Sequence, residues 1–328
     1  MSDTNSTDNT DILIDISTAI LRAHDGVLQF RALDDGGKSV KRLPFGPFMP
    51  DRHRTMEIGL RQWVREQVGV DLAHVEQLYT FADQGRYKSG EGRHVVSVGY
   101  LALAQGRMGP EDDAGGAWAN LYGYFPWEDW RDGRPDMLDK IIMPALDKWL
   151  AQNDEARARV RLAFGRDGAQ WDEEFVLERY ELLYEAGLVE EAVRDAPHGR
   201  DTRARQKQTP SPPTLGTAMQ LDHRRISATA LGRLRSKLKY RPVIFDLMPD
   251  RFTLRALQQT TELVLGTALH KQNFRRLVEK SGFVEATGET SRARGRPAEL
   301  FRFRHGNRAD RPLAGLRVSG GRKSSGSK

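Results

Sequence analysis

The sequence predicts an α/β sandwich in the first half of the chain, followed by helices and then by a small basic domain of two helices and a β-hairpin. Three observations lead to this prediction. Strand-like and helical runs are mixed within residues 12–150, helical patterns alone occupy 151–197, and apolar periodicity returns over 220–305. Mixed strands and helices over about 150 residues are typical of one compact domain.

The elements of the first domain follow in chain order. Apolar and polar residues alternate over 12–33 around Asp25 and Gly26, which predicts a β-hairpin. The remaining runs predict a helix over 55–68, strands over 75–81 and 94–104, and a helix over 137–150. We therefore expect the first domain to span residues 12–150.

The segments that flank and follow this domain differ in composition. Apolar spacing predicts helices over 153–165 and 172–192. Residues 198–219 are rich in Pro, Thr and Arg and have little to bury, so they predict a flexible linker. The polar segment 1–11 and the basic Gly/Ser-rich tail 306–328 are expected to be disordered.

Composition excludes several classes of protein. The chain has no cysteine, which rules out disulfides, thiolate catalysis and cysteine zinc sites. No apolar run approaches the ~20 residues of a membrane-spanning helix. The start of the chain lacks the pattern of a signal peptide, so a cytoplasmic location is expected.

Charge is unevenly distributed along the chain. The formal net charge is +6, and residues 200–328 carry 28 of the 51 basic residues but only 10 of the 45 acidic ones. An acidic first part joined to a basic second part predicts two roles, the second of them involving a polyanion. The competing interpretation is a solvated basic surface without such a partner.

The basic part predicts the layout of a winged helix-turn-helix. A helix over 222–240 comes first, with apolar residues every four positions and a basic outer face. Thr253 is suited to cap the next helix, and the helix after it, over 268–280, ends at Gly282. Two strands over 283–289 and 299–304 then flank a hairpin tip that carries Arg292, Arg294 and Arg296.

This layout suits double-stranded DNA. The second helix of the pair offers hydrogen-bond donors to base edges in the major groove, from Lys271, Gln272, Asn273, Arg275 and Arg276. The three arginines of the hairpin tip can reach phosphates or the minor groove. A homodimer is expected, because palindromic operators match two-fold proteins. The alternative is a winged helix that docks a protein and uses its arginines for solubility.

The first half resembles a Nudix domain, and the whole chain resembles the Nudix-related transcriptional regulators of NAD metabolism, the NrtR type, most closely their alphaproteobacterial branch. The resemblance covers most of residues 12–150 and 220–305. Its segments are LPFGPFMPDRHRTMEIGLRQWVREQVGV, VEQLYTFADQGR with VVSVGYLAL, KLKYRPVIFDLMP, and FTLRALQQTTELVLGTALHKQNFRRLVEKSGFVEATGE with RGRPAELFRF. It implies an α/β/α sandwich that senses an adenine nucleotide metabolite (ADP-ribose, NAD or ATP) and a winged helix that binds operators of NAD biosynthesis or salvage genes.

The Nudix pattern G-x5-E-x7-R-E-U-x-E-E-x-G-U, with U apolar, is only partly present. Aligned on Gly69, its two charged pairs fall on Gln62-Trp63 and Glu66-Gln67. Glu66 alone remains acidic, whereas hydrolysis with Mg²⁺ needs several carboxylates to hold the metal. We therefore predict a catalytically inactive domain that requires no metal or other cofactor.

The candidate effector-binding residues are Trp63, Glu66 and Arg86. Arg86 matches an arginine that lies near the ligand pocket in the family. Each has a competing interpretation: Trp63 as a core residue, Glu66 as a surface carboxylate, and Arg86 as a solvated loop residue. Ile58 and Val64, on the same helix as Trp63, are expected in the core.

These observations predict a ligand-responsive transcriptional repressor. The helix over 222–240 joins sensor and reader, so it is the candidate for transmitting the signal or for dimerisation. The rival is an active Nudix pyrophosphohydrolase acting on ADP-ribose or a related nucleoside diphosphate derivative. A third reading is an RNA- or protein-binding adaptor, for which the sequence lacks the aromatic platforms that single-stranded RNA recognition favours.

Overall fold

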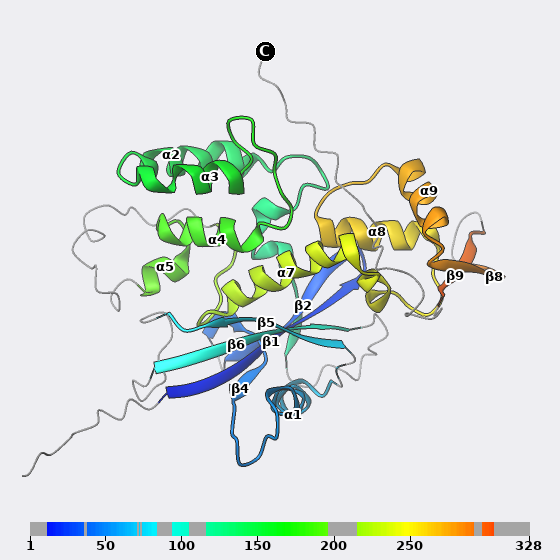
Figure 1. Cartoon of the computed structure of the whole chain (residues 1–328), viewed down its shortest axis with the longest axis horizontal. Coiled ribbons are helices and arrows are strands. Elements are labelled where there is room, and N and C mark those ends of the chain that lie inside the picture. The colour runs from blue at the N-terminus through cyan, green and yellow to red at the C-terminus, as the bar shows by residue number, and fades with distance from the viewer. Residues whose placement is uncertain are drawn as a thin grey trace, which may run out of the picture.

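The computed structural model of the chain describes residues 12–35, 38–70, 72, 74–83, 94–104, 116–195, 215–291 and 297–304. Within them lie a mixed β-sheet, helices that cover it, and a winged helix at one end of the molecule (Figure 1). No helix of these residues combines the length and the apolar character needed to cross a membrane.

The sheet has seven strands among the described residues. Its order is β3-β2-β1-β6-β5, with β4 paired to β1 and β7 paired to β2. Strands β1 and β6 run parallel, and the other neighbours run antiparallel. The strands are β1 Ile12–His24, β2 Val27–Asp35, β3 Lys38–Arg42, β4 Phe45–Pro47, β5 His74–Phe81, β6 His94–Leu103 and β7 Ala117–Asn120.

The predicted hairpin is confirmed. His24 of β1 lies opposite Val27 of β2, so Asp25 and Gly26 form a two-residue turn. Their φ angles are 46° and 73°, as in the type I′ turn whose twist matches that of paired strands. Aspartate and glycine tolerate this conformation, which explains why the turn could be located from the sequence.

Helix α1, Met56–Val68, covers one face of the sheet, as predicted (Figure 1). Thr55 caps its start by accepting a hydrogen bond from the Ile58 N–H at 3.2 Å, and Gly69 ends it with a φ of 68°. The expected burial of Val64 is confirmed. That of Ile58 is wrong, since this side chain is 47% exposed and lies outside the stripe of residues 60, 64 and 68 that faces the sheet.

The chain between the sheet and the linker is mostly helical. Its elements are the 3-10 turns η2 Leu121–Gly123 and η3 Pro126–Glu128, the π turn η4 Leu138–Ile142, α2 Met143–Leu150, η5 Asp154–Ala156, α3 Arg157–Ala163, α4 Val176–Glu185 and α5 Glu190–Asp195. The helices expected over 137–150 and 153–165 are confirmed. A continuous helix over 172–192 is wrong, because Gly187 adopts a φ of 70° and turns the chain after α4.

Helix α7, His223–Tyr240, lies on the opposite face of the sheet from α1 and packs against β1, β5, β6 and α4 (Figure 1). The predicted basic outer face is wrong in part, since Arg224 and Arg235 are 1% and 0% exposed. The helix is the second helical layer of the sandwich, although the sequence grouped it with the C-terminal domain. Its apolar residues therefore pack within the chain.

The described chain resumes at Leu215, inside the segment expected to be a linker. Leu215 and Met219 are buried, and Met219 pairs with Lys41 of β3 in an isolated bridge. These last residues before α7 are therefore packed against the first domain. Outside the described residues lie most of the expected linker and both segments expected to be disordered, 1–11 and 306–328.

The winged helix has the expected order of elements: η7 Val243–Leu247, α8 Leu254–Leu265, α9 Lys271–Ser281, β8 Val284–Thr290 and β9 Glu299–Phe303. Thr253 caps α8 by accepting from the Ala256 N–H at 3.1 Å, and Gly282, with a φ of 66°, ends α9. Helix α9 begins at Lys271 instead of 268, since the turn that starts at Gly266 takes the intervening residues.

Candidate functional site

The Nudix-like motif lies on α1 and on the preceding loop, where β4 pairs with β1. Trp63 and Gln67 stand at two of its acidic positions. The indole Nε1 of Trp63 donates to Pro47 O at 3.1 Å. The Gln67 amide donates to Phe45 O at 2.6 Å and accepts from the Phe45 N–H at 3.1 Å. Both side chains thus tie α1 directly to β4.

At positions 63 and 67 these hydrogen bonds differ from the ligand arrangement of a divalent-cation site. In such a site, carboxylate and carbonyl oxygens converge on the cation. Here N–H donors face the carbonyls of Phe45 and Pro47 and satisfy them without a metal. Glu66, the remaining acid, is exposed and accepts from Gln62 Nε2 at 2.8 Å. Among the described residues, no group of three or more His, Asp or Glu side chains is placed to hold a metal ion.

The Trp63 indole also packs directly on Gly46, where an added Cβ would lie 2.7 Å from Nε1. Gly46→Ala is expected to lower the free energy of unfolding by about 1–3 kcal/mol, because Trp63 is held by Pro47 and cannot move aside freely. Urea denaturation measures this loss. The control is Gly123→Ala, since nothing lies within 4 Å of a Cβ at that position. Equal stabilities of the two variants would contradict the packing argument.

The structure separates the candidate effector contacts predicted from the sequence. Trp63 is half-buried against Gly46, and Glu66 is exposed on α1. The side chains of Trp63 and Glu66 have different partners, Pro47 for the indole and Gln62 for the carboxylate. Arg86 lies outside the described residues. A role in effector binding therefore stays a prediction for all three.

A second group of candidate ligand contacts was missed in the sequence and lies on the sheet face that α1 covers. The ring centroid of Trp118, on β7, is 3.9 Å from the guanidinium carbon of Arg22 and 5.4 Å from that of Arg31. Arg22 also donates to the Gln29 side chain at 2.8 Å. Arg31 is 0% exposed and Arg22 9%, so the guanidinium group of Arg22, beside the half-buried Trp118, is the one that can reach a phosphate oxygen through its edge. One signal in the sequence could have found this group. Gln29 and Arg31 are two residues apart on a strand, so both side chains lie on the same face of β2.

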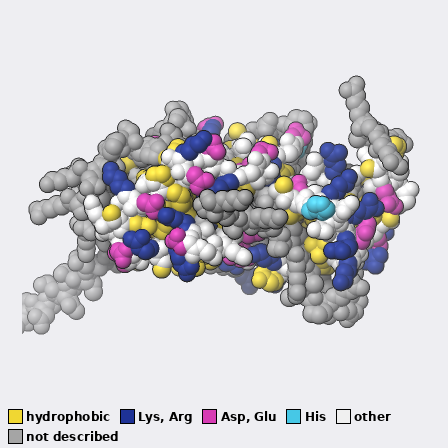
Figure 2. Space-filling view, turned by 90° about the horizontal axis from the view of Figure 1, so that it is seen from above, with side chains coloured by type: hydrophobic (Ala, Val, Ile, Leu, Met, Phe, Trp, Pro, Cys, Tyr) yellow, Lys and Arg dark blue, Asp and Glu magenta, His cyan; other side chains and the backbone are white. Residues whose placement is uncertain are grey.

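Helix α9 presents its polar side chains to solvent, as predicted. Phe274 and Val278 are buried. The exposed residues are Lys271, Gln272, Asn273, Arg275 and Arg276. Figure 2 shows Lys and Arg side chains gathered at the winged-helix end of the molecule. The three arginines of the hairpin tip, Arg292, Arg294 and Arg296, lie outside the described residues.

Part of this basic surface is paired with carboxylates. Arg275 Nε lies 2.8 Å from Glu279 Oε1, one turn later on α9. On the hairpin, Arg302 and Arg304 lie 2.6 and 3.3 Å from the carboxylate of Glu285. Exposed pairs of this kind contribute little to stability. Each arginine can therefore exchange its carboxylate for a phosphate or a base at small cost.

A buried cluster of charges, also missed in the sequence, lies where η3, α4 and α7 meet. Glu128 accepts from Arg179 Nε at 2.5 Å and from Arg235 Nη1 at 2.6 Å, and all three side chains are 0% exposed. Burial alone raises the pKa of Glu128, but the two guanidinium groups outweigh it and hold the pKa below its ordinary value. The carboxylate is therefore charged at neutral pH.

Comparisons with known proteins agree with this architecture. Residues 244–303 match the family model of the NrtR DNA-binding winged helix domain. Over 94 residues the chain is 42% identical to the ADPR responsive transcriptional repressor NtrR of Acinetobacter baylyi, a match that covers 27% of this chain and 38% of that protein. The chain thus spans well under half the length of this curated relative.

Most of the chain is similar in fold to NrtR from Shewanella oneidensis. The structure of that protein in complex with a 27mer DNA matches with a TM-score of 0.52 at 18% identity, covering 89% of this chain and 93% of that one. Its structure without DNA matches with a TM-score of 0.51 at 17% identity, covering 89% and 94%. At such identities the likeness establishes the fold alone. Residues 244–303 therefore match the NrtR winged-helix family, and the chain as a whole is similar in fold to a Nudix-related protein of the NrtR type.

Proposed function

We propose that the protein is a ligand-responsive transcriptional repressor of NAD biosynthesis or salvage genes. The observation that carries this proposal is the DNA-binding winged helix over 244–303, whose α9 exposes polar and basic side chains. The curated relative is named as an ADPR-responsive repressor. Helix α9 would enter the major groove of an operator, and a homodimer would match a palindromic one.

The first domain would act as the sensor of an adenine nucleotide metabolite. ADP-ribose is the first candidate, and NAD and ATP are the others. All three carry linked phosphate groups, which suit the guanidinium group of Arg22 beside Trp118. The bonds of Trp63 and Gln67 to backbone carbonyls favour binding without hydrolysis, since they occupy the acidic positions of the motif with N–H donors.

Effector binding is therefore expected to be independent of divalent cations. Calorimetry should give the same affinity for ADP-ribose in EDTA and in Mg²⁺, within about twofold. The rival function, an active pyrophosphohydrolase, predicts AMP release from ADP-ribose with Mg²⁺ or Mn²⁺ and its loss in Glu66→Gln. A time course of AMP formation with the folded protein separates the two functions, and steady release would overturn the sensor proposal.

DNA binding and its response to the effector are tested with the full chain. The protein is titrated into a labelled duplex selected from a random pool and into an unselected duplex, with and without ADP-ribose. Tighter binding of the selected duplex and weaker binding at high salt are expected, because phosphate contacts release counterions. The effector should change the affinity by about 5–150-fold. Equal affinity for both duplexes, with no effect of any of the three ligands, contradicts the proposal.

A further inference from the structure

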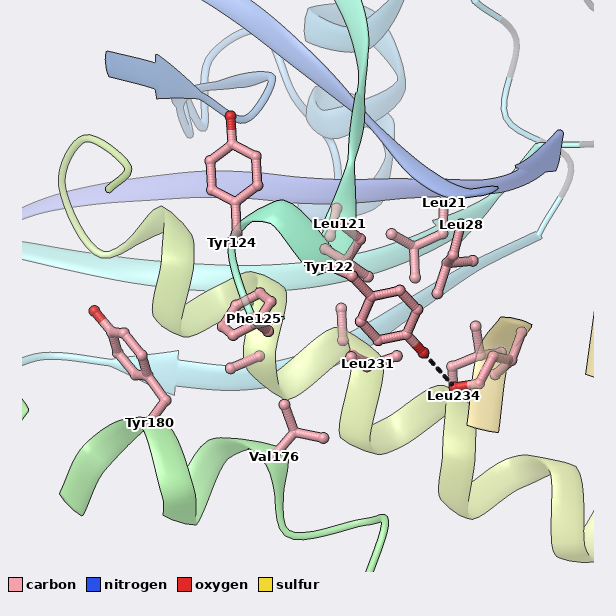
Figure 3. Close-up of a cluster of buried hydrophobic side chains, with 14 of the residues drawn as sticks. Leu21, Leu28, Leu121, Tyr122, Tyr124, Phe125, Val176, Tyr180, Leu231 and Leu234 are labelled. Atoms are coloured by element: carbon pink, nitrogen blue, oxygen red, sulfur yellow. Dashed lines mark hydrogen bonds between the residues drawn. The ribbon is translucent and has the colours of Figure 1, made fainter. Parts of the chain in front are cut away.

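The C-terminal end of α8 is held by side chains from outside the winged helix. The hydroxyl of Tyr122 donates to Leu263 O at 2.6 Å, and Arg235 Nε donates to Val264 O at 2.9 Å. Tyr122 belongs to η2, which follows β7, whereas Arg235 belongs to α7. In Figure 3 the Tyr122 ring lies in the buried apolar cluster, and a hydrogen bond leaves from its hydroxyl.

These bonds satisfy groups that a helix cannot satisfy by itself. The last four carbonyls of an α-helix lack partners within the helix. In α8, two of them accept from Tyr122 and Arg235. Burial raises the pKa of Tyr122 above its ordinary value, so its hydroxyl keeps the proton that it donates. The end of α8 is therefore anchored to the sheet domain by directional bonds.

The turn after α8 fits closely on the same surface. Gly266 has a φ of 65°, and its carbonyl accepts from the Trp130 N–H at 2.7 Å. A Cβ at this position would lie 2.7 Å from Arg235 Nη2 and 2.9 Å from the Tyr122 hydroxyl. Glycine is thus required both for its conformation and for the close approach. The turn between α8 and α9 therefore packs directly against residues 122–130.

Helix α9 follows this turn, and Leu269, two residues before α9 begins, is hydrogen-bonded to α8. The Leu269 N–H donates to Glu262 Oε1 at 2.8 Å, and Gln258 Nε2 donates to Leu269 O at 3.0 Å. Gln258 also donates to Glu262 at 2.9 Å, which orients both side chains. These bonds hold the turn that leads into α9 to the side of α8, so the start of α9 follows the position of α8.

The segment that holds α8, β7 followed by η2, also contributes to the sheet face that α1 covers, where Trp118 lies. Strand β7 leads directly into η2, and its Trp118 stacks with Arg22 and Arg31 on the face of the sheet that α1 covers. Tyr122, a few residues later, contacts α8 near the α7 face of the sheet. One short stretch of chain therefore joins the two faces.

We propose that Tyr122 and Arg235 are positioning residues for DNA reading, which link β7 to α8 and α9. The inference rests on the proposed function. In this proposal, a phosphate-bearing ligand that pairs with Arg22 beside Trp118 shifts β7, and the bonds of Tyr122 and Arg235 carry that shift to the end of α8. A ligand shifts an equilibrium only through different affinities for two states, so these bonds differ between the DNA-binding and the released arrangement.

Tyr122→Phe is the variant to test, since Arg235 also belongs to the buried charge cluster and its loss would destabilise the whole chain. The matched control is Tyr124→Phe, a buried tyrosine of the same segment whose ring packs against Phe30. For each full-length protein, the affinity for the selected duplex is measured with and without saturating ADP-ribose. Hydrogen exchange is followed at residues 263–270.

The measured quantity is the ratio of the DNA affinities without and with ADP-ribose. In Tyr122→Phe this ratio should be at least about threefold closer to one than in the unsubstituted protein. Exchange at 263–270 should become faster, because the end of α8 is released. Tyr124→Phe should keep the original ratio and exchange. An unchanged ratio in Tyr122→Phe, beside a clear effector response of the unsubstituted protein, overturns this inference alone.

A second measurement does not depend on any variant. ADP-ribose added to the unsubstituted protein should change exchange at 263–270, and no change there overturns the inference even if Tyr122→Phe fails to fold. Failure of the unsubstituted protein to bind the selected duplex, or to respond to the ligand, overturns the proposed function and the inference with it.

Discussion

Glu128→Ala is expected to lower the free energy of unfolding by about 3–5 kcal/mol, the largest loss of stability among the changes considered. It leaves Arg179 and Arg235 as two buried guanidinium groups without their carboxylate. The loss is measured by urea denaturation. Glu155→Ala, at an exposed carboxylate of η5, is the control and should change stability by less than about 0.5 kcal/mol. Similar losses in both variants would show that the cluster is not needed for stability.

The same cluster gives a pH dependence with a definite sign. The two arginines hold the pKa of Glu128 in the folded protein below its ordinary value of 4.5, in spite of the opposing effect of burial. The ionised carboxylate therefore contributes its full stability above that ordinary value, and the contribution is lost as the pH falls through the lower, folded-state pKa. The difference in unfolding free energy between the unsubstituted protein and Glu128→Gln should stay constant near neutrality and shrink in acid.

Arg275→Ala is expected to weaken binding to the selected duplex by about 1–3 kcal/mol, or roughly 5–150-fold. The side chain is exposed on α9, and its pairing with Glu279 restricts the guanidinium before DNA arrives. The measurement is the dissociation constant at several salt concentrations. Arg157→Ala is the matched control, because this exposed arginine of α3 also has a nearby carboxylate partner, Asp154, and lies outside the winged helix.

The interpretation of α9 fails if Arg275→Ala binds the selected duplex as tightly as the Arg157→Ala control at every salt concentration. A loss that is equal for selected and unselected duplexes assigns Arg275 to phosphate contact. A loss confined to the selected duplex assigns it to a base edge. The two outcomes therefore also define what the helix reads.

Local signals made the elements predictable. The Asp25-Gly26 turn, the cap at Thr253 and the helix end at Gly282 all rest on residues within a few positions of the structure that they define. In each case the residue type favours the backbone conformation that the structure shows, and tertiary contacts reinforce it. The same reasoning failed over 172–192, where apolar spacing continues through Gly187 but the backbone does not continue as a helix.

The position of α7 could not be predicted in this way. Arg235 reads as a surface residue in a basic helix, and its burial depends on Glu128, which is 107 positions away in the chain. Similarly, alignment to the Nudix pattern identified Trp63 and Gln67 as replacements for acids. Their bonds to backbone carbonyls became visible only with the strand β4 in place.

The placement of α7 also limits how this architecture can be divided or recombined. A fragment that ended before His223 would leave the apolar face of the sheet around Ala19, Leu21 and Leu101 uncovered. A transplanted winged helix beginning after Tyr240 would lose Arg235, which completes the end of α8. Helix α7 packs against the sheet and also holds the end of α8. A chimera that exchanges DNA-binding specificity between relatives should therefore take α7, the sheet and α8 from sequences that are compatible at these contacts.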